Sequence, residues 1–402
     1  MSPYFTATKI KNLKEQAIAA MDVHKAKLTE ISMEIHDHPE LCFQEFRASK
    51  LLADYLKAND FKVEYPAYGL DTAFTATIGS GKPKIAILAE YDAVADIGHA
   101  CGHNVIGTSA IGAGVSLASV IDKLGGTVVI IGTPAEEGGN GKEIMIKRGA
   151  FADIDAAMMI HPTSGESKVH FESPAFIVLK TEYFGKVAHP SEPALGINAQ
   201  DAMMIAFVAF NALRIATPFP PAIDGTITKA GVEQHTLIPD HTVANLHVRA
   251  RTDADLKNRL EKILNCFKAG ALATGARLEY QYDWEMRYRG LHPNRVMGNL
   301  FDANMKLVNP NWNPAPTLPG EIDGATDMGN VGTVVPGIHP WIAIAPAEVA
   351  WHSPAATKAT ATAEAHKGMS NCAKAMAMTT IDLIAKPELL NKARAEFEKQ
   401  EK

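Results

Sequence analysis

The sequence has few cysteines, no excess of basic residues and no apolar leader at its start. Four cysteines in 402 residues are too few for a disulfide-stabilised scaffold. The 39 basic residues are outnumbered by 45 acidic ones, so the net charge of −6 offers no basic surface for nucleic-acid phosphates. The first residues, MSPYFTATKIKNLKEQ, lack the apolar core of a signal peptide. We therefore expect a cytoplasmic protein that binds neither nucleic acid nor a membrane.

Two catalytic signatures are also missing. The string GSGKP at residues 79–83 lacks both the upstream glycine and the following Ser or Thr of a phosphate-binding loop, so it indicates a turn. No GxSxG string is present, which argues against a serine hydrolase of that type. What the chain does have is 47% hydrophobic and 21% charged residues, an ordinary globular composition. Its length predicts two or three domains.

Apolar periodicity predicts an α/β fold. Residues 10–35 repeat with a period of about 3.6, so we expect a helix that ends at His38-Pro39. A second helix is expected at about 45–59, and the two apolar segments that flank GSGKP, 72–78 and 84–89, indicate a hairpin.

Later segments predict a buried sheet. The apolar run 104–121 is rich in Gly, Ser and Ala and indicates a buried helix. It is followed by the apolar strands TVVIIG, at 127–132, and AAMMI, at 156–160. Helices that alternate with continuously apolar strands are typical of a mostly parallel sheet.

The middle of the chain has a different order of elements. We expect strands and helices in the order β-α-β-β-α-β, at 176–183, 198–215, 225–231, 242–251, 253–273 and 277–282. A helix at 294–308, a strand at 341–345 and a long helix at 358–385 then resume the first pattern. The sequence therefore predicts a ferredoxin-like domain, 172–290, inserted into an α/β domain made of 1–171 and 291–402.

Potential metal ligands lie at the predicted strand ends. Cys101 and His103 are two residues apart, and on an extended segment such side chains point the same way. Glu136 and Glu137 directly follow the strand TVVIIG, and ligands gather at the carboxyl ends of strands in open α/β sheets. Each pair alone is compatible with a structural role.

Two more histidines complete the pattern. His161 follows the strand AAMMI, and His352 lies in a loop after the apolar segment that ends at Ala345. Thiol, imidazole and carboxylate together are the ligand types of a transition-metal site. The other cysteines, Cys42, Cys266 and Cys372, are in apolar contexts at or near predicted helices and are expected to be small core residues.

The strings that carry these residues resemble the M20 family of metallopeptidases and amidohydrolases. Within its aminoacylase-like branch they look most like the dipeptidase and aminobenzoyl-glutamate hydrolase group. The matching strings, in the expected order, are HPELCFQE, EYDA with GHACGHN, TPAEEGGNGK, HPT after AMMI, GKVAHPSEPALGINAQDA, GATDMGN and WHSP. The resemblance implies a zinc-peptidase-like catalytic domain whose inserted domain serves as a lid and dimerises the protein.

The resemblance also implies an activity and its residues. The activity is hydrolysis of the amide bond of small N-acyl amino acids or dipeptides by two divalent metal ions, Mn, Zn, Co or Ni, in a homodimer. Glu136 is the implied general base on a water that bridges the metals, and Asp92 is the carboxylate that orients a ligating imidazole. His189 is the residue expected to reach the substrate carbonyl oxygen. The implied metal ligands are Cys101, His103, Glu137, His161 and His352.

Several positions depart from the family pattern or leave alternatives open. Relatives commonly have a proline where this chain has Ala95, and an Asn where it has Thr236, while Asp96 adds a charge beside the metal loop. Arg249 and Arg251 lie on one face of a predicted strand, where they either clamp a substrate carboxylate or face solvent.

Two further residues are near the site by resemblance alone. Asp327 and Asn330, in GATDMGN, either bind substrate or hold a loop.

Two other functions also remain open: a strict dipeptidase that requires a free amino terminus, and a catalytically silent dimer that acts as a scaffold. The presence of every implied ligand and of Glu136 argues against the silent dimer.

Overall fold

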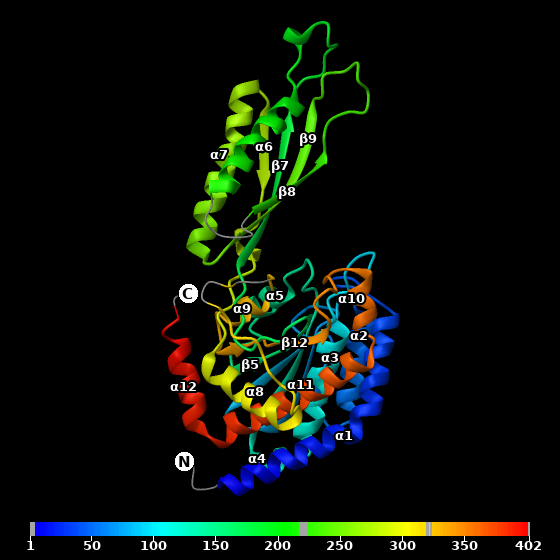
Figure 1. Ribbon diagram of the computed structural model, residues 1–402, viewed down its shortest axis with the longest axis vertical. Coiled ribbons are helices and arrows are strands. Elements are labelled where there is room, and N and C mark those ends of the chain that lie inside the picture. The colour runs from blue at the N-terminus through cyan, green and yellow to red at the C-terminus, as the bar shows by residue number, and fades with distance from the viewer. Residues whose placement is uncertain (1–4, 217–222, 319–320, 322–323, 401–402) are drawn as a thin grey trace. The chain divides into compact units, whose positions relative to one another are not determined.

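The computed structural model describes residues 5–216, 223–318, 321 and 324–400. Their chain forms two compact units, which are coloured along the sequence in Figure 1. The first unit contains residues 1–172, 291–321 and 326–402, and the second contains residues 173–290 and 322–325. Each has its own hydrophobic core.

A six-stranded, mostly parallel sheet forms the centre of the first unit. Its strand order is β1-β2-β4-β3-β5-β11. The pairs β3–β4, β3–β5 and β5–β11 are parallel, whereas β1–β2 and β2–β4 are antiparallel. The strands are β1 (Lys62–Glu64), β2 (Phe74–Ser80), β3 (Lys84–Glu90), β4 (Gly126–Thr133), β5 (Ala156–Met158) and β11 (Gly337–Ile338). A separate parallel pair joins β6 (His161–Ser164) to β12 (Trp341–Ala345).

The predicted hairpin around GSGKP is wrong. Both strands exist, but β4 lies between them and pairs with β2 on one edge and with β3 on the other. Every residue of β4 is buried, and so is every residue of β3 after Lys84. A strand that is buried on both faces belongs in the middle of a sheet, where it has a neighbour at each edge.

Helices cover this sheet. The helix α3 packs on β3 and β4 and contacts α1, α2 and α11. It confirms the predicted buried helix, since its residues 103–117 are all buried. The helices of this unit are α1 (Ala7–Asp37), α2 (Phe46–Lys57), α3 (His103–Ala118), α4 (Ile121–Leu124), α5 (Gly141–Lys147), α8 (Arg295–Val308), α9 (Met328–Val331), α10 (Pro354–Ala359), α11 (Ala363–Ala385) and α12 (Pro387–Phe397).

One helix prediction is confirmed at its end, and another is wrong in its extent. The first helix ends at Asp37 with His38 as its cap, as the His38-Pro39 pair predicts. The single long helix expected at 358–385 is instead two helices, α10 and α11. The break falls where the Thr362 hydroxyl accepts a hydrogen bond from the backbone N–H of Ala365 and caps α11.

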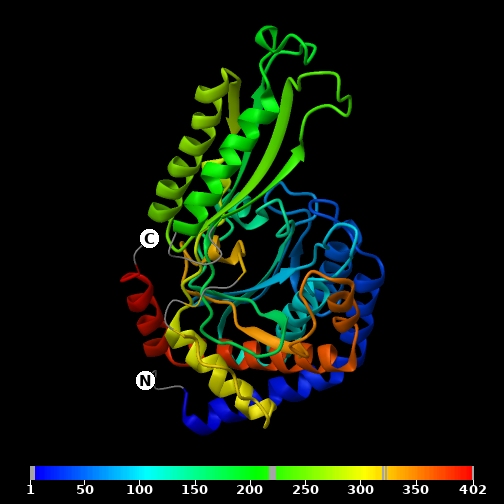
Figure 2. The same ribbon diagram turned by 45° about the horizontal axis from the view of Figure 1, so that its top comes forward.

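The second unit has the predicted β-α-β-β-α-β order. Its four strands form an antiparallel sheet in the order β10-β7-β9-β8. Helices α6 and α7 lie side by side along this sheet (Figures 1 and 2). The elements are β7 (Ala175–Phe184), α6 (Ala199–Ala216), β8 (Ile223–Lys229), β9 (His241–Ala250), α7 (Asp253–Thr274) and β10 (Arg277–Gln281).

Helix α6 is apolar on more than its buried face. Among the described residues it is the one helix long and apolar enough to cross a membrane by length and composition alone, with a mean hydropathy of 1.2. Its side chains Ala202, Met203, Ala206 and Phe210 are buried in the core of the unit. Because a core helix passes the same test of length and composition, this helix is weak support for a membrane span.

Candidate metal centre

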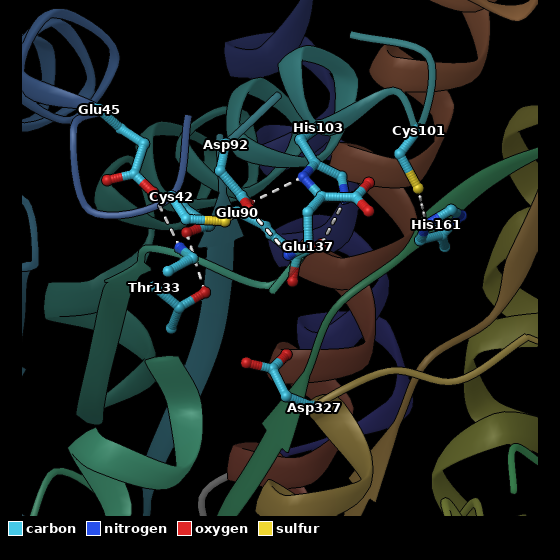
Figure 3. Close-up of polar contacts among 12 residues, drawn as sticks. Cys42, Glu45, Glu90, Asp92, Cys101, His103, Thr133, Glu137, His161 and Asp327 are labelled. Carbon is cyan, nitrogen blue, oxygen red and sulfur yellow. Dashed lines mark hydrogen bonds and ion pairs between the residues drawn. The ribbon is translucent and has the colours of Figure 1, made fainter. Parts of the chain in front are cut away.

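Five of the side chains singled out from the sequence come together in the first unit. The ligand atoms of Cys101, His103 and His161 lie within 4.8 Å of one another, and so do those of Cys101, Glu137 and His352. The Cys101 Sγ atom is 3.3 Å from His161 Nε2 and 3.4 Å from His352 Nε2. Figure 3 shows Cys101 beside His161, with His103 and Glu137 next to them. One thiol therefore belongs to both groups.

A tight turn places Cys101 and His103. The spacing predicted an extended segment, but the two residues do not lie on one. Gly102 between them is left-handed, with φ of 80°, and His103 is the first residue of α3. A Cβ atom on Gly102 would stand 2.4 Å from Pro162 Cγ. The glycine thus lets the turn pack against the segment that begins with His161.

The other residues of the cluster come from the ends of strands or from the loops beside them. Glu136 and Glu137 follow β4, as predicted, and the preceding Ala135 is left-handed with φ of 62°. His161 does not simply follow a strand: β5 ends at Met158 and His161 begins β6. His352 lies between β12 and α10 with φ of 55°, and about half of its side chain is exposed.

Asp92 joins His103 to the Glu136-Glu137 loop. Its Oδ1 is 3.0 Å from His103 Nδ1, and its Oδ2 accepts a hydrogen bond of 2.9 Å from the Glu137 backbone N–H. Burial alone would raise the pKa of Asp92. The charge of His103 and these hydrogen bonds outweigh burial and lower the pKa to about 2. The carboxylate therefore stays ionised and turns the Nε2 atom of His103 toward the cluster.

Three buried atoms in the cluster have no hydrogen-bond partner among the described residues. They are Glu90 Oε1, His103 Nε2 and Glu137 Oε1. His103 Nε2 is 3.1 Å from Glu90 Oε1 and 3.8 Å from Glu137 Oε1. Buried polar atoms nearly always have a hydrogen-bond partner in folded proteins. Oxygen and nitrogen atoms that lack one and lie close together can instead serve as ligands, so this arrangement fits a place for metal ions.

Burial controls the protonation of two further residues. It lowers the pKa of His161 to about 3, aided by the nearby charge of His103, so His161 is neutral at neutral pH and has a lone pair for a metal. Burial, followed by the charge of Glu137, raises the pKa of the Cys101 thiol well above its ordinary value. A cation bound at its sulfur would replace that proton.

Glu136 is a buried carboxyl group beside other acids. Burial and the charges of Glu90 and Glu137 raise its pKa well above the ordinary value for a glutamate. A raised pKa makes a carboxylate a stronger base, which suits a group that accepts a proton before it returns it. Its ligand atom also lies within 4.8 Å of those of Glu90 and His103.

The comparison with protein families covers most of the chain. Residues 86–387 match the model of peptidase family M20/M25/M40. The chain belongs to this family. Because its curated relatives include a dipeptidase and an amidohydrolase, the M20 chain is a hydrolase that acts on amide bonds.

Curated relatives include two kinds of hydrolase. The Xaa-Arg dipeptidase of Mus musculus is 32% identical over 98% of this chain and 94% of its own length. One subunit of the p-aminobenzoyl-glutamate hydrolase of Escherichia coli K12 is 30% identical over 73% of this chain and 65% of its own length.

Solved structures share the fold of the M20 chain. A putative aminohydrolase from methicillin-resistant Staphylococcus aureus has a TM-score of 0.74 at 23% identity, over 92% of this chain and 100% of its own. A dinuclear metal-binding M20 peptidase from Bacillus subtilis has a TM-score of 0.66 at 19% identity, over 90% of this chain and 99% of its own.

The M20 chain also has a buried ion network that the sequence did not reveal. Lys142 is fully buried, and its Nζ atom contacts Glu90 Oε2 and, at 2.5 Å, Asp327 Oδ1. The Lys142 backbone N–H donates to Asp327 Oδ2 at 3.1 Å. Asn330 Nδ2 donates to Glu143 Oε2 at 2.8 Å. These contacts favour a loop-holding role for Asp327 and Asn330 over substrate binding.

Cys42 is not the core residue that its sequence context predicted. It lies in the loop between α1 and α2, is partly exposed, and its Sγ atom is 3.5 Å from Asp92 Oδ2. Burial and the charge of Asp92 raise its pKa to about 12. Cys372 is buried in α11, as expected, whereas Cys266 on α7 is partly exposed.

The remaining candidates of the M20 chain belong to the second unit and are described within it. His189 is exposed, with its Nδ1 atom 2.7 Å from Ser191 Oγ. Arg249 lies on β9 with its guanidinium 5.6 Å from the centre of the Phe176 ring, but Arg251 follows the end of that strand.

The departures from the family pattern lie in loops. Ala95 and Asp96 are exposed in the turn that the backbone bond from Val94 N–H to Gly98 O closes at 3.0 Å. Thr236, in the second unit, accepts a hydrogen bond of 2.9 Å from the Gln234 side chain.

Proposed function

We propose that this protein hydrolyses the amide bond of small N-acyl amino acids or dipeptides with the help of two divalent metal ions. One observation carries the proposal: two groups of ligand atoms share the sulfur of Cys101. Two overlapping groups of ligand atoms would hold two cations near each other. The proposed ligands are Cys101, His103, Glu137, His161 and His352.

The donor set fits such ions. One thiolate and one carboxylate carry fewer negative charges than two divalent ions carry positive ones, so the ions and their five ligands together would carry a net positive charge that favours an anionic transition state. The ions would supply Lewis-acid activation of the attacking water and of the substrate carbonyl. Thiolate and imidazole are compatible with Zn, Mn, Co or Ni.

Glu136 is the proposed general base. Its carboxylate takes a proton from the attacking water and returns it to the leaving amine. Its burial and its raised pKa support this role, because such a carboxyl group holds the proton between the two steps. Asp92 acts through other residues: it orients the imidazole of His103 and holds the backbone of Glu137.

His189 is the proposed donor to the substrate's developing oxyanion. Removal of one such donor typically lowers turnover on the order of 100-fold to 1000-fold. Arg249 and Arg251 are the proposed binding residues for a substrate carboxylate. The inserted unit is proposed to act as the lid over the substrate.

The proposed assembly is a homodimer formed through the second unit. The apolar side chains Met204, Ile205, Val208 and Ile215 of α6 are exposed by 39% to 85%. A second copy of the same face would bury them, and a two-fold dimer uses the same patch on both partners. The proposed location is the cytoplasm, in keeping with four free thiols.

A strict dipeptidase is the second candidate function. It is favoured by the similarity to the Xaa-Arg dipeptidase over 98% of the chain. The two candidates differ in whether the substrate needs a free amino terminus. A dipeptide and its N-acetylated form therefore distinguish them.

A substrate panel tests the proposal. Protein loaded with Mn²⁺, Zn²⁺ or Co²⁺ is mixed with dipeptides that end in arginine, their N-acetylated forms, N-acyl amino acids and aminobenzoyl-glutamate, and released amine is measured. Glu136→Gln is the control, with turnover expected to fall by roughly 100-fold to 10,000-fold while the metal stays bound. A Gln variant that turns over at the wild-type rate would refute the role of Glu136. Wild-type protein that binds two ions and hydrolyses nothing would favour the scaffold instead.

A further inference from the structure

Glu45 has a buried carboxyl group that the proposed mechanism does not use. It precedes α2, and its side chain is fully buried. Its Oε1 atom accepts hydrogen bonds of 2.9 Å from the backbone N–H groups of both Phe43 and Ala135. Its Oε2 atom accepts a hydrogen bond of 2.7 Å from the Thr72 hydroxyl. One side chain thus ties together three segments that are far apart in the sequence.

One of these partners precedes the proposed base. Ala135 is left-handed, with φ of 62°, a conformation that an alanine adopts only at a cost. Its carbonyl oxygen accepts hydrogen bonds from Gly139 and Gly141, at 3.1 and 3.2 Å, and so closes the loop that carries Glu136 and Glu137. An unfavourable backbone conformation persists only where its surroundings hold it.

The loop is held on both sides of Glu136. The backbone N–H before it, that of Ala135, donates to Glu45, and the one after it, that of Glu137, donates to Asp92. Figure 3 shows Glu45 and Asp92 on the side of Glu137 that faces away from Cys101. The direction of the Glu136 and Glu137 side chains therefore depends on two buried carboxyl groups, those of Glu45 and Asp92.

We infer that Glu45 is a positioning residue for Glu136 and Glu137. It acts through the backbone of Ala135 and touches neither substrate nor metal. The inference rests on the proposed function, since it concerns the residue proposed as general base. A displacement of about 1 Å in a catalytic group can lower the rate on the order of 100-fold.

Two substitutions separate the length of the Glu45 side chain from its acidic group. Glu45→Gln keeps the length of the side chain: its amide oxygen can accept both backbone bonds, and its amide N–H can donate to Thr72 Oγ1, whose hydroxyl turns to accept. Glu45→Asp keeps the carboxyl group but draws it back by about one C–C bond, so the bond to Ala135 is lost. Thr72→Val is the matched control, because it removes the contact to Oε2 and leaves the bond to Ala135 in place.

The four proteins are compared in kcat, KM, bound metal and hydrogen exchange of the peptide that covers residues 133–139. We expect Glu45→Asp to lose roughly 10-fold or more in kcat, with KM and two bound metal ions retained and faster exchange. Glu45→Gln and Thr72→Val are expected to stay within about 3-fold of the wild-type kcat and to keep the wild-type exchange.

Other outcomes overturn the inference. A Glu45→Asp variant with full kcat and unchanged exchange would show that Ala135 holds its conformation unaided. An equal loss in the Gln variant would assign the effect to the acidic group, and a lower melting temperature with no change in kcat would assign it to stability. Full activity in Glu45→Asp beside an inactive Glu136→Gln would refute the positioning role alone. An active Glu136→Gln would refute the proposed function, whatever Glu45 does.

Discussion

At the scale of single residues, Asp92 has contacts that no neutral side chain of its size can reproduce. Both of its oxygens face donors, the imidazole of His103 and the backbone N–H of Glu137. An asparagine has one oxygen and one amide group, so one of the two donors would face N–H. The carboxylate is thus needed for both contacts.

We therefore predict that Asp92→Asn weakens metal binding by roughly 10-fold to 100-fold, because partners that orient a ligating histidine typically contribute that much. Competition with a chelator measures the affinity. Cys42→Ala, which removes a contact of 3.5 Å to the same carboxylate, is the control and should stay within about 3-fold. Equal affinities for wild type and Asp92→Asn would show that Asp92 does not orient a ligand.

Glu45 makes a second residue-scale prediction, on pH and stability. Burial raises its pKa from 4.5 to about 7. The folded state therefore keeps this proton up to about pH 7, while the unfolded state releases it near 4.5, so stability from this group is present at low pH and is lost as the pH rises through that window. The shift corresponds to about 3 kcal/mol, at about 1.4 kcal/mol per pH unit.

Glu45→Gln has no proton to lose. Relative to wild type, its free energy of unfolding should therefore rise by about 3 kcal/mol between pH 4.5 and pH 8. Denaturant unfolding of both proteins in the presence of a chelator measures this difference. A difference that does not vary with pH would mean that Glu45 is ionised in the folded protein throughout the range.

At the scale of elements, helices α6 and α7 meet at a glycine. A Cβ atom on Gly270 of α7 would stand 2.3 Å from the Ala202 carbonyl oxygen of α6 and 2.7 Å from the Tyr183 hydroxyl. Alanine in place of glycine usually stabilises a helix, but here the backbone of the neighbouring helix leaves no room.

Gly270→Ala is accordingly predicted to destabilise the protein by about 1–3 kcal/mol. Leu272→Ala lies two residues further along the same helix, where the side chain is 89% exposed, and should change stability by no more than about 0.5 kcal/mol. Thermal unfolding of the two variants and of the wild type measures these changes in stability. A more stable Gly270→Ala would show that the two helices can move apart without cost.

The elements also show what a sequence can and cannot tell. The buried helix α3 and the β-α-β-β-α-β order were predictable because periodicity and apolar runs are local properties. Which strands pair with each other is not a local property of the sequence. The hairpin predicted between β2 and β3 was therefore wrong: β4, which follows some 35 residues after β3, lies between them.

The same limit applies to the site. The side chains of Cys101, His103 and Glu137 could be singled out because motifs carry them, and the structure brings their ligand atoms together. The roles of Glu45 and Lys142 could not be predicted, because their partners lie up to 185 residues away in the chain. A buried charge becomes visible only when its neighbours are known.

At the scale of the whole molecule, the exposed apolar face of α6 is the proposed dimer interface. Val208 on this face is 72% exposed. We predict that Val208→Asp separates the proposed dimer into monomers, because a buried unpaired charge at an interface is strongly unfavourable. Light scattering after gel filtration measures the mass. Leu272→Asp, on an exposed position of α7, should leave the dimer intact. A wild-type monomer would refute the proposed dimer, and a dimeric Val208→Asp would place its interface elsewhere.

The most direct test of the two-metal mechanism is a metal titration of the stripped protein in which bound metal and amine release are followed together. Activity should rise until two ions are bound to each chain, and Glu136→Gln should bind the same two ions without turnover. Full activity with one ion, or turnover in Glu136→Gln equal to that of the wild type, would contradict a two-metal hydrolase that uses Glu136 as its base.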